Sequence, residues 1–514
     1  MTEMSKDTKQ PASELFFAFV GSVGTDFSNV QDILKDNLDR VGYTSIEIKL
    51  SSLLDNVVIP NSKVTLVTSP EDKRITSYMD KGNNLRKHTQ EGGILSLLAI
   101  SKINEIRKEQ DLGGKKVAYI IKSLKHPDEV HVLRRTYGEG FFLIGAHSSY
   151  GSCLHNLAKS IGRSKGTAEI EKFLPIAEDL IKRDQEEPDE FGQRVRDSYH
   201  LADVFVSLQS ENSIKKAIGK FIELIFGNTF HTPTKDEYLM FFAHVAASRS
   251  ASLARQVGAV IATERGEILS VGVNDVPSPK GGLYWVDDEG DCRDHIQKED
   301  SNTKQIYKIL DEVVQVLKKN GVKTDTIKDL PTVLKNTRLM NLTEFGRMVH
   351  AEMDAITQAA RIGVSVNNGH LFTTVFPCHN CAKHIIAAGI KKVIYIEPYP
   401  KSLASDLHKD AIAVEGEKIK GKVFFRSFVG IGPRRYLDLF SLITSTGEEL
   451  KRKDIVGDVI DWDSKKARLR LAVSPSAYLD KEIIALAKLD DKMKIGEQKY
   501  GKSSAKVKRQ SRKG

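Results

Sequence analysis

Four residues in the second half of the chain have the types and spacing of a metal-dependent hydrolytic site. His350 and Glu352 are two positions apart, and Cys378 and Cys381 are three positions apart. Imidazole and thiolate are the usual ligands of zinc, and one His with two Cys fills three of its four tetrahedral positions. The open position can hold a water whose pKa falls to about 7. The residues therefore predict one catalytic Zn²⁺ per site, with Glu352 free to move protons.

Local structure must bring these four side chains together. Pro377 suits the start of a helix, and Cys378 and Cys381 would share one face of that helix, whose N-terminus favours thiolate. On an ideal helix His350 and Glu352 point about 200° apart, because each residue turns about 100°. We therefore expect His350 at the very start of its helix, with the Glu352 side chain directed back toward the metal.

A purely structural zinc site is the alternative interpretation. It would need a fourth Cys or His ligand. Cys153 and Cys292 are isolated in the sequence, and His379 and His384 lie on the same short segment as the two thiols. The residue pattern therefore favours a catalytic site over a structural one.

The pattern H-x-E followed by P-C-x-x-C is the signature of the zinc deaminases. The segments around it, residues 248–261, 272–277, 373–383 and 389–393, resemble deoxycytidylate (dCMP) deaminases. This resemblance implies a cytidine-deaminase-like α/β/α sandwich. It also implies that Asn274 binds the substrate sugar, that Arg255 binds phosphate, and that Ala351 and Thr374 contact the substrate. The residues alone also fit another interpretation, in which Asn274 is a turn residue after a strand and Arg255 is a solvated residue at the end of a helix.

A glycine loop near the N-terminus has the context of a phosphate-binding loop. Gly21, Ser22, Gly24 and Thr25 follow an apolar run at 16–20 and precede a helical stretch at 27–41. Such a loop holds anions with backbone N–H groups. Thr25 stands where the lysine of a P-loop belongs, so we expect a regulatory nucleotide, or Mg²⁺, rather than phosphoryl transfer. Segments 123–135 and 183–196 resemble nucleotide kinases of the P-loop class.

Hydrophobic patterning indicates an α/β protein with two domains. Apolar runs at 16–20, 116–121, 141–145 and 202–206 alternate with helical stretches, which predicts a parallel sheet with helices on both faces. We assign residues 1–14 to a polar arm, 15–230 to the P-loop kinase-like domain and 231–470 to the deaminase domain, with an insertion at about 292–340. A helix over 471–490 and a basic disordered tail over 491–514 complete the assignment.

Composition excludes several classes of protein. The 514 residues carry a net charge of +9, four cysteines and 40% hydrophobic residues, values typical of a globular protein without a disulfide framework. Residues 492–514 hold nine Lys and Arg and one Glu, a charge of +8, which leaves +1 for the rest. No apolar run approaches the roughly 20 residues that span a bilayer, and the polar N-terminal residues lack the apolar h-region typical of a signal peptide. We expect a cytoplasmic protein without a membrane partner.

The pairing of the two domains resembles the bacterial anti-phage dCTP/dCMP deaminases. The resemblance implies deamination of dCTP and dCMP, which depletes deoxycytidine nucleotides during phage infection. It also implies a homo-oligomer, a nucleotide effector such as dTTP, and an RNA or protein repressor; Arg434 and Arg435 would contact triphosphate. The alternatives are a nucleic-acid editor that uses the basic tail and a nucleotide sensor with an inert deaminase domain.

Overall fold

The computed structural model describes residues 13–322, 333–334, 337, 339–398, 402–415 and 417–510, without the side chains of 341 and 495–510. The expected N-terminal arm up to residue 12 and the last four residues of the expected tail lie outside this range. The chain forms two compact units. Unit 1 comprises residues 1–234 and 429–514, and unit 2 comprises Lys235–Phe428.

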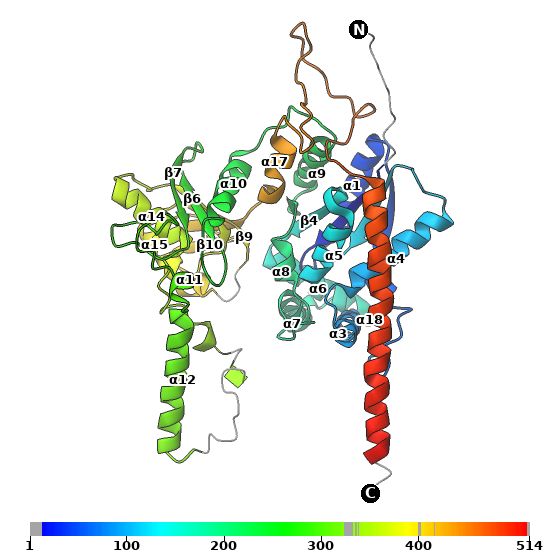
Figure 1. The fold of residues 1–514 in the computed structure, drawn as a ribbon, viewed down its shortest axis with the longest axis horizontal. Coiled ribbons are helices and arrows are strands. Elements are labelled where there is room, and N and C mark those ends of the chain that lie inside the picture. The colour runs from blue at the N-terminus through cyan, green and yellow to red at the C-terminus, as the bar shows by residue number, and fades with distance from the viewer. Residues whose placement is uncertain are drawn as a thin grey trace. The chain divides into compact units, whose positions relative to one another are not determined.

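Unit 1 is built on a six-stranded sheet in the order β12-β5-β4-β1-β3-β2 (Figure 1). Its first five strands in sequence are parallel, and the short β12 pairs antiparallel with β5. The strands are β1 (Leu15–Val20), β2 (Thr44–Lys49), β3 (Val117–Lys122), β4 (Phe141–His147), β5 (Val204–Ser207) and β12 (Gly430–Ile431). The predicted parallel sheet is confirmed.

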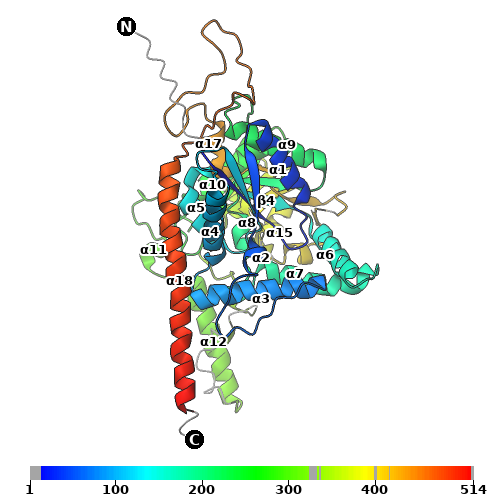
Figure 2. The same ribbon diagram turned by 90° about the vertical axis from the view of Figure 1, so that its right-hand side faces the viewer.

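Helices cover both faces of this sheet. On one face, Phe17 and Phe19 of β1 pack with α1 and α9; on the other, Phe16 stacks on Tyr137 of α5. Helix α18 lies along α4 and α5 (Figure 2). The helices are α1 (Ser28–Arg40), α2 (Leu50–Leu53), α3 (Glu71–Thr89), α4 (Ile94–Glu109), α5 (Pro127–Tyr137), α6 (Tyr150–Ser164), α7 (Leu174–Gln185), α8 (Val195–Tyr199), α9 (Glu211–Ile225), α17 (Tyr436–Phe440) and α18 (Pro475–Gln510).

Unit 2 is an α/β/α sandwich around a second six-stranded sheet, in the order β10-β11-β9-β8-β6-β7. β6 and β7 form a hairpin, and β6 runs antiparallel to β8. The strands are β6 (Gly258–Ala262), β7 (Ile268–Val273), β8 (His370–Val375), β9 (Lys392–Glu397), β10 (Ile412–Val414) and β11 (Val423–Ser427). The helices are α10 (Lys235–Ala247), α11 (Asp294–Gln297), α12 (Ser301–Lys319), α14 (Ala351–Ile362), α15 (His379–Ala387) and α16 (Ala404–Leu407).

Two of these helices lie on the face of the sheet that carries the candidate site. α14 and α15 pack their alanine-rich sides against β6, β8 and β9. α10 covers the opposite face, where Gly258 allows its backbone to approach the sheet closely. Both α14 and α15 end as the sequence indicates: Gly363 adopts a φ of 76° and Gly389 a φ of 74°, the left-handed conformation of a helix C-terminus.

Three expectations need correction. The deaminase domain does not extend to residue 470, because the chain leaves unit 2 at Phe428 and β12 then joins the sheet of unit 1. Arg255 does not lie at a helix end, because α10 ends at Ala247 and residues 248–257 form a loop. The backbone remains helical through Gln510, so the tail is not disordered from 491; lysine, glutamine and alanine are good helix formers.

Candidate metal centre

His350 and Glu352 lie at the start of α14. His350 is the N-cap residue, with extended backbone angles (φ −74°, ψ 154°), and Glu352 lies in the first turn. His350 is therefore not on the helical wheel, and its imidazole and the Glu352 carboxylate can point to the same place. The expectation that His350 stands at the beginning of the helix is confirmed. Because His350 precedes the first helical residue, the divergence of about 200° expected for two residues on an ideal helix does not apply.

The two cysteines come from α15, on a different element of the same unit. Cys378 is the N-cap of α15 and Cys381 lies one turn further along, fully buried. The Sγ atoms of Cys378 and Cys381 lie 3.4 Å and 3.3 Å from Nδ1 of His350. Among the described residues, these three form the group of His, Cys, Asp or Glu whose donor atoms could hold a metal, all within 4.8 Å of one another.

The donor set fits zinc in both chemistry and distance. Tetrahedral coordination, with Zn–S of about 2.3 Å and Zn–N of about 2.0 Å, places sulfur and nitrogen about 3.5 Å apart. The observed separations of 3.3 and 3.4 Å agree with that value. Three protein ligands leave the fourth tetrahedral position for a water or substrate atom. The geometry is that of an open, catalytic type of zinc site.

Burial and neighbouring charges tune the ionisation of this cluster. Hydrogen bonding with Cys381 and with His350 lowers the pKa of the Cys378 thiol to about 4, as a metal ligand requires. Burial raises the pKa of Glu352, with a further contribution from the charge of Cys378. The Cys381 thiol donates to Oε2 of Glu352 at 3.3 Å. A carboxyl with a raised pKa beside a metal site is suited to accept and return protons.

Asn274, the residue expected to bind the sugar, has a structural role in this unit. Its Oδ1 accepts a hydrogen bond from the Val257 amide at 2.6 Å, and its Nδ2 donates to the Arg255 carbonyl at 2.8 Å. The side chain therefore holds the loop that follows α10. Each of its polar atoms keeps capacity for one more hydrogen bond, so a sugar contact stays a prediction.

The other expected substrate residues lie around the same loop. Arg255 pairs with Glu397 at 2.8 Å and is half-exposed. Thr374 accepts the Gly258 amide at 3.3 Å. Ala351 is buried between the two functional residues of α14. Their predicted roles in substrate binding are not tested by these contacts.

Two buried aspartates that the sequence reasoning missed support the site. Asp275 accepts the amides of Ala251 and Val276, and its carbonyl accepts the amide of Val349, directly before His350. Asp354 accepts the amide of Val273, which joins α14 to β7. Their positions in the sequence could have indicated this role, because Asp275 directly follows Asn274 and Asp354 lies two residues after Glu352.

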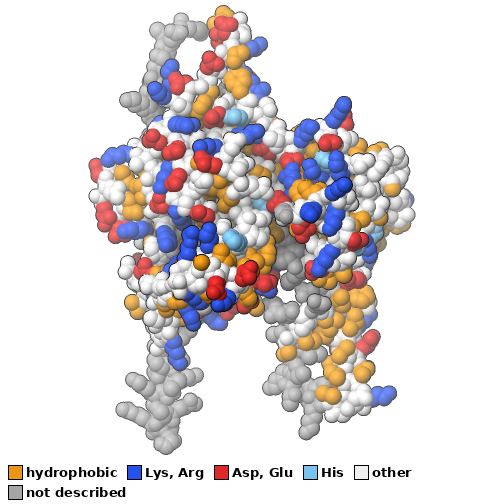
Figure 3. All heavy atoms as spheres, turned by 180° about the vertical axis from the view of Figure 1, so that it is seen from behind, with side chains coloured by type: hydrophobic (Ala, Val, Ile, Leu, Met, Phe, Trp, Pro, Cys, Tyr) orange, Lys and Arg blue, Asp and Glu red, His pale blue; other side chains and the backbone are white. Residues whose placement is uncertain are grey.

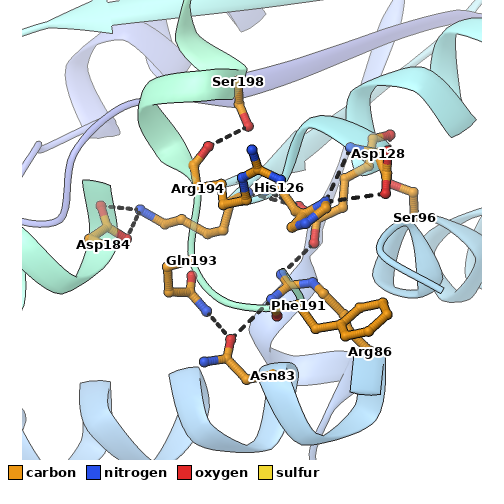
Figure 4. Close-up of polar contacts among 12 residues, drawn as sticks. Asn83, Arg86, Ser96, His126, Asp128, Asp184, Phe191, Gln193, Arg194 and Ser198 are labelled. Carbon is orange, nitrogen blue, oxygen red and sulfur yellow. Dashed lines mark hydrogen bonds and ion pairs between the residues drawn. The ribbon is translucent and has the colours of Figure 1, made fainter. Parts of the chain in front are cut away.

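The glycine loop of unit 1 already holds an anion from its own chain. The Val23 amide donates to the buried Asp184 carboxylate at 2.7 Å, and the Lys125 ammonium binds both Asp184 and the Gly21 carbonyl. Lys125 reaches the loop from the segment after β3, and its partner Asp184 lies at one side of the polar cluster shown in Figure 4. Lys125 thus supplies the ammonium group that a P-loop would carry at position 25. In this structure that group binds the Asp184 carboxylate and not a phosphate.

The lower part of the same cluster fixes the segment after α7. Arg86 pairs with Glu129, both fully buried, and donates to Asn83 and to the Phe191 carbonyl (Figure 4). Gln193 also donates to Asn83. The Arg86 charge is thus paired with Glu129 inside the chain, while its buried Nε has no hydrogen-bond partner among the described residues.

Comparison with known proteins places the site in a deaminase region. Residues 233–397 match the family described as the cytidine and deoxycytidylate deaminase zinc-binding region. The chain is 29% identical over 168 residues to the deoxycytidylate deaminase of Enterobacteria phage T4, covering 33% of this chain and 80% of that protein. It is 24% identical over 218 residues to the human deoxycytidylate deaminase, covering 42% and 91%.

Solved structures include dCMP deaminase from the cyanophage S-TIM5 in complex with dCMP and dUMP. That match has 21% identity, covers 39% of this chain and 100% of that chain, and has a TM-score of 0.23. The second half of the chain contains a deaminase zinc-binding domain of the dCMP and cytidine type.

Proposed function

We propose that this protein hydrolyses the 4-amino group of free deoxycytidine nucleotides, releasing ammonia. The chain is an enzyme of the cytosine nucleotide deaminase class. The observation that carries the proposal is the convergence of His350, Cys378 and Cys381 with the buried Glu352 inside the matched region. This arrangement provides three ligands, an open coordination position and a proton carrier.

The residues divide the chemistry among them. Zinc, when bound by His350 and the two cysteines, supplies a water activated near neutral pH. Glu352 accepts a proton from the attacking water and delivers it to N3 of the cytosine ring. It then takes the proton of the new C4 hydroxyl group and passes it to the amine at C4, so that the C4–N bond breaks, ammonia leaves and the C4 carbonyl forms. Burial of Glu352 keeps this proton exchange away from bulk solvent.

The substrate range and biological role are finer proposals. We propose dCMP and dCTP as substrates, with Asn274 at the sugar and Arg255 at a phosphate, and depletion of the deoxycytidine pool in anti-phage defence. Homo-oligomerisation, a dTTP-like effector and an RNA or protein repressor belong to the same proposal. For unit 1 we propose a regulatory nucleotide at the glycine loop; such a ligand must displace Asp184 from the Val23 amide.

The central test uses the purified full chain with each cytosine nucleotide, with and without dTTP and ATP. Uracil products are followed by mass spectrometry. We expect turnover on dCMP or dCTP and a loss of at least about 10²-fold in kcat for Glu352→Gln, with zinc content unchanged. Glu264→Gln, an exposed acid on the hairpin of the same unit, is the matched control and keeps full activity. Undiminished turnover in Glu352→Gln would exclude the assigned role.

Two further measurements separate the alternatives. Deleting residues 492–514 leaves turnover on free nucleotides intact in a nucleotide deaminase, but abolishes salt-dependent binding and activity in a nucleic-acid editor. Stoichiometric zinc with no turnover on any cytosine nucleotide would support the inert sensor instead.

A further inference from the structure

Residues 291–294, at the start of the expected insertion, fold into unit 2. Within this segment Arg293 and Asp294 are buried, at 7% and 6% exposed. The later helix α12 is arranged differently, because it extends away from the sheet of its unit (Figure 1) and carries hydrophobic side chains along its surface (Figure 3). Charged side chains are almost never fully buried unless they are paired, so the partners of Arg293 and Asp294 indicate what this segment holds in place.

The first partner is Arg347, which lies three residues before the candidate ligand His350. Its Nη1 donates to the Asp294 carboxylate at 2.9 Å, and Nη1 and Nη2 each donate to the Cys292 carbonyl at 3.1 Å. A guanidinium is planar and its donors form a rigid fork, so two acceptors on one segment fix its direction. Residues 292–294 therefore hold the chain that leads into His350.

The second partner is Asp275, which connects Arg293 to the same stretch of chain. The Arg293 guanidinium binds the Asp291 carboxylate at 2.6 Å and lies 3.7 Å from the Asp275 carboxylate, which is 2% exposed. The Asp275 backbone carbonyl accepts the amide of Val349, the residue directly before His350, at 3.0 Å. A buried carboxylate is costly without a compensating charge, so Arg293 stabilises Asp275 in this position.

His350 depends on these contacts because its helix holds it from one side alone. As the N-cap of α14 it has extended backbone angles, and its carbonyl accepts the first helical hydrogen bond, from the Asp354 amide at 2.8 Å. On its N-terminal side the chain is held by the Arg347 side chain and by the Val349 amide. Both of these contacts lead back to residues 291–294.

We infer that residues 291–294 are a positioning clamp for His350, which restrains residues 347–349 so that the imidazole is in place before a metal binds. The inference rests on the proposed ligand role of His350, but not on the identity of the substrate. Without the clamp, backbone next to His350 would have to be ordered when zinc binds. Ordering the backbone of one residue corresponds to about a tenfold change in a dissociation constant.

The zinc affinity of the metal-free full chain tests the clamp, measured by competition with a chelator. Arg293→Met removes the connection through Asp275, and Arg347→Met removes the connection to Asp294. We expect each variant to raise the zinc dissociation constant about tenfold. The Arg347 side chain is 42% exposed, so Arg347→Met should fold and gives a result even where Arg293→Met does not.

Arg426→Met is the matched control in the same unit. Arg426 lies in β11 and pairs with Asp236, and its side chain is 21% exposed. This variant also loses an ion pair of a partly buried arginine, but it leaves residues 347–349 untouched. We expect a lower midpoint of thermal unfolding with wild-type zinc affinity, because a purely structural role does not change the affinity of the folded protein.

The outcomes separate the clamp from the metal centre itself. Wild-type zinc affinity in folded Arg347→Met and Arg293→Met overturns the clamp, and so does an equal loss of affinity in Arg426→Met. A wild-type chain that binds no zinc refutes the metal centre and the clamp together.

Discussion

Gly272 is the position where a single methyl group should disturb the candidate metal centre without touching any of its ligands. It lies in β7, directly beneath the first turn of α14. A Cβ at this position would lie 2.1 Å from the Ala351 carbonyl oxygen and 2.4 Å from the Ala355 amide nitrogen. Both atoms belong to the helix backbone, so rotation of a side chain cannot relieve the clash.

The size of the displacement follows from these distances. Real Cβ contacts are essentially never shorter than 3.0 Å, so the helix must move by at least about 0.9 Å from the strand. Ala351 stands between His350 and Glu352, whereas Cys378 and Cys381 belong to α15 and do not move with it. Overpacking of this kind costs about 1–3 kcal/mol of folding free energy. A misplacement of about 1 Å in a catalytic group costs about 10²-fold in rate.

Gly272→Ala should therefore fold, with a lowered midpoint of thermal unfolding, and lose about 10²-fold in kcat/KM on the best nucleotide substrate. The control is Gly346→Ala in the same unit, where the new Cβ would meet only the Thr343 carbonyl oxygen at 3.4 Å, an ordinary contact. We expect wild-type stability and turnover from that control. Wild-type stability and turnover in Gly272→Ala would refute the claim that contact between β7 and α14 sets the geometry of the site.

Two further predictions concern ion pairs of unit 1. Arg107 binds both Glu14 and Glu482, at 2.7 Å each, in a nearly dry environment, so Arg107→Met should lower the free energy of unfolding by about 3–5 kcal/mol in a denaturant titration. The hydrogen bond with Lys35 lowers the pKa of Glu47 from 4.5 to about 2, so its stabilising effect is present above pH 4.5 and is lost as the pH falls toward 2. Because Glu47 is 40% exposed, Glu47→Gln should destabilise by at most about 1 kcal/mol at pH 7, and the difference should vanish near pH 2.

The sequence predicted the parts of the fold that depend on local patterning. Apolar runs placed the strands β1, β3, β4 and β5 within a few residues, because buried residues recur regularly within each segment. Pro377 and the spacing of His350 and Glu352 likewise placed the starts of α15 and α14. The three candidate zinc ligands were predicted from their side-chain types and spacing, because one imidazole and two thiolates at this spacing are typical of a zinc site. His350, Cys378 and Cys381 do converge in the structure.

The missed features depend on contacts between distant segments. The return of the chain to unit 1 rests on β12, a two-residue strand that pairs with β5 more than 220 positions earlier and has no periodicity to detect. Arg435, expected at a triphosphate, is instead buried and paired with Asp203 and Glu139. The resemblance to dCMP deaminases assigns Asn274 and Arg255 to the substrate. The structure adds internal partners that the sequence does not reveal, Val257 and Glu397, and the two substrate roles stay predictions.

Two of the proposed zinc ligands lie at the starts of helices, and this position bears on the proton transfer proposed for Glu352. His350 caps α14 and Cys378 caps α15, so the partly positive N-termini of two helices point at one centre and stabilise thiolate there. A dication bound to two thiolates and a neutral imidazole carries no net charge. Glu352 is then the remaining ionisable group of the cluster, and burial, the largest contribution, raises its pKa. A carboxyl that loses its proton nearer to neutral pH can both take a proton from water and return it to the substrate, whereas a solvated glutamate would stay ionised and serve only as a base.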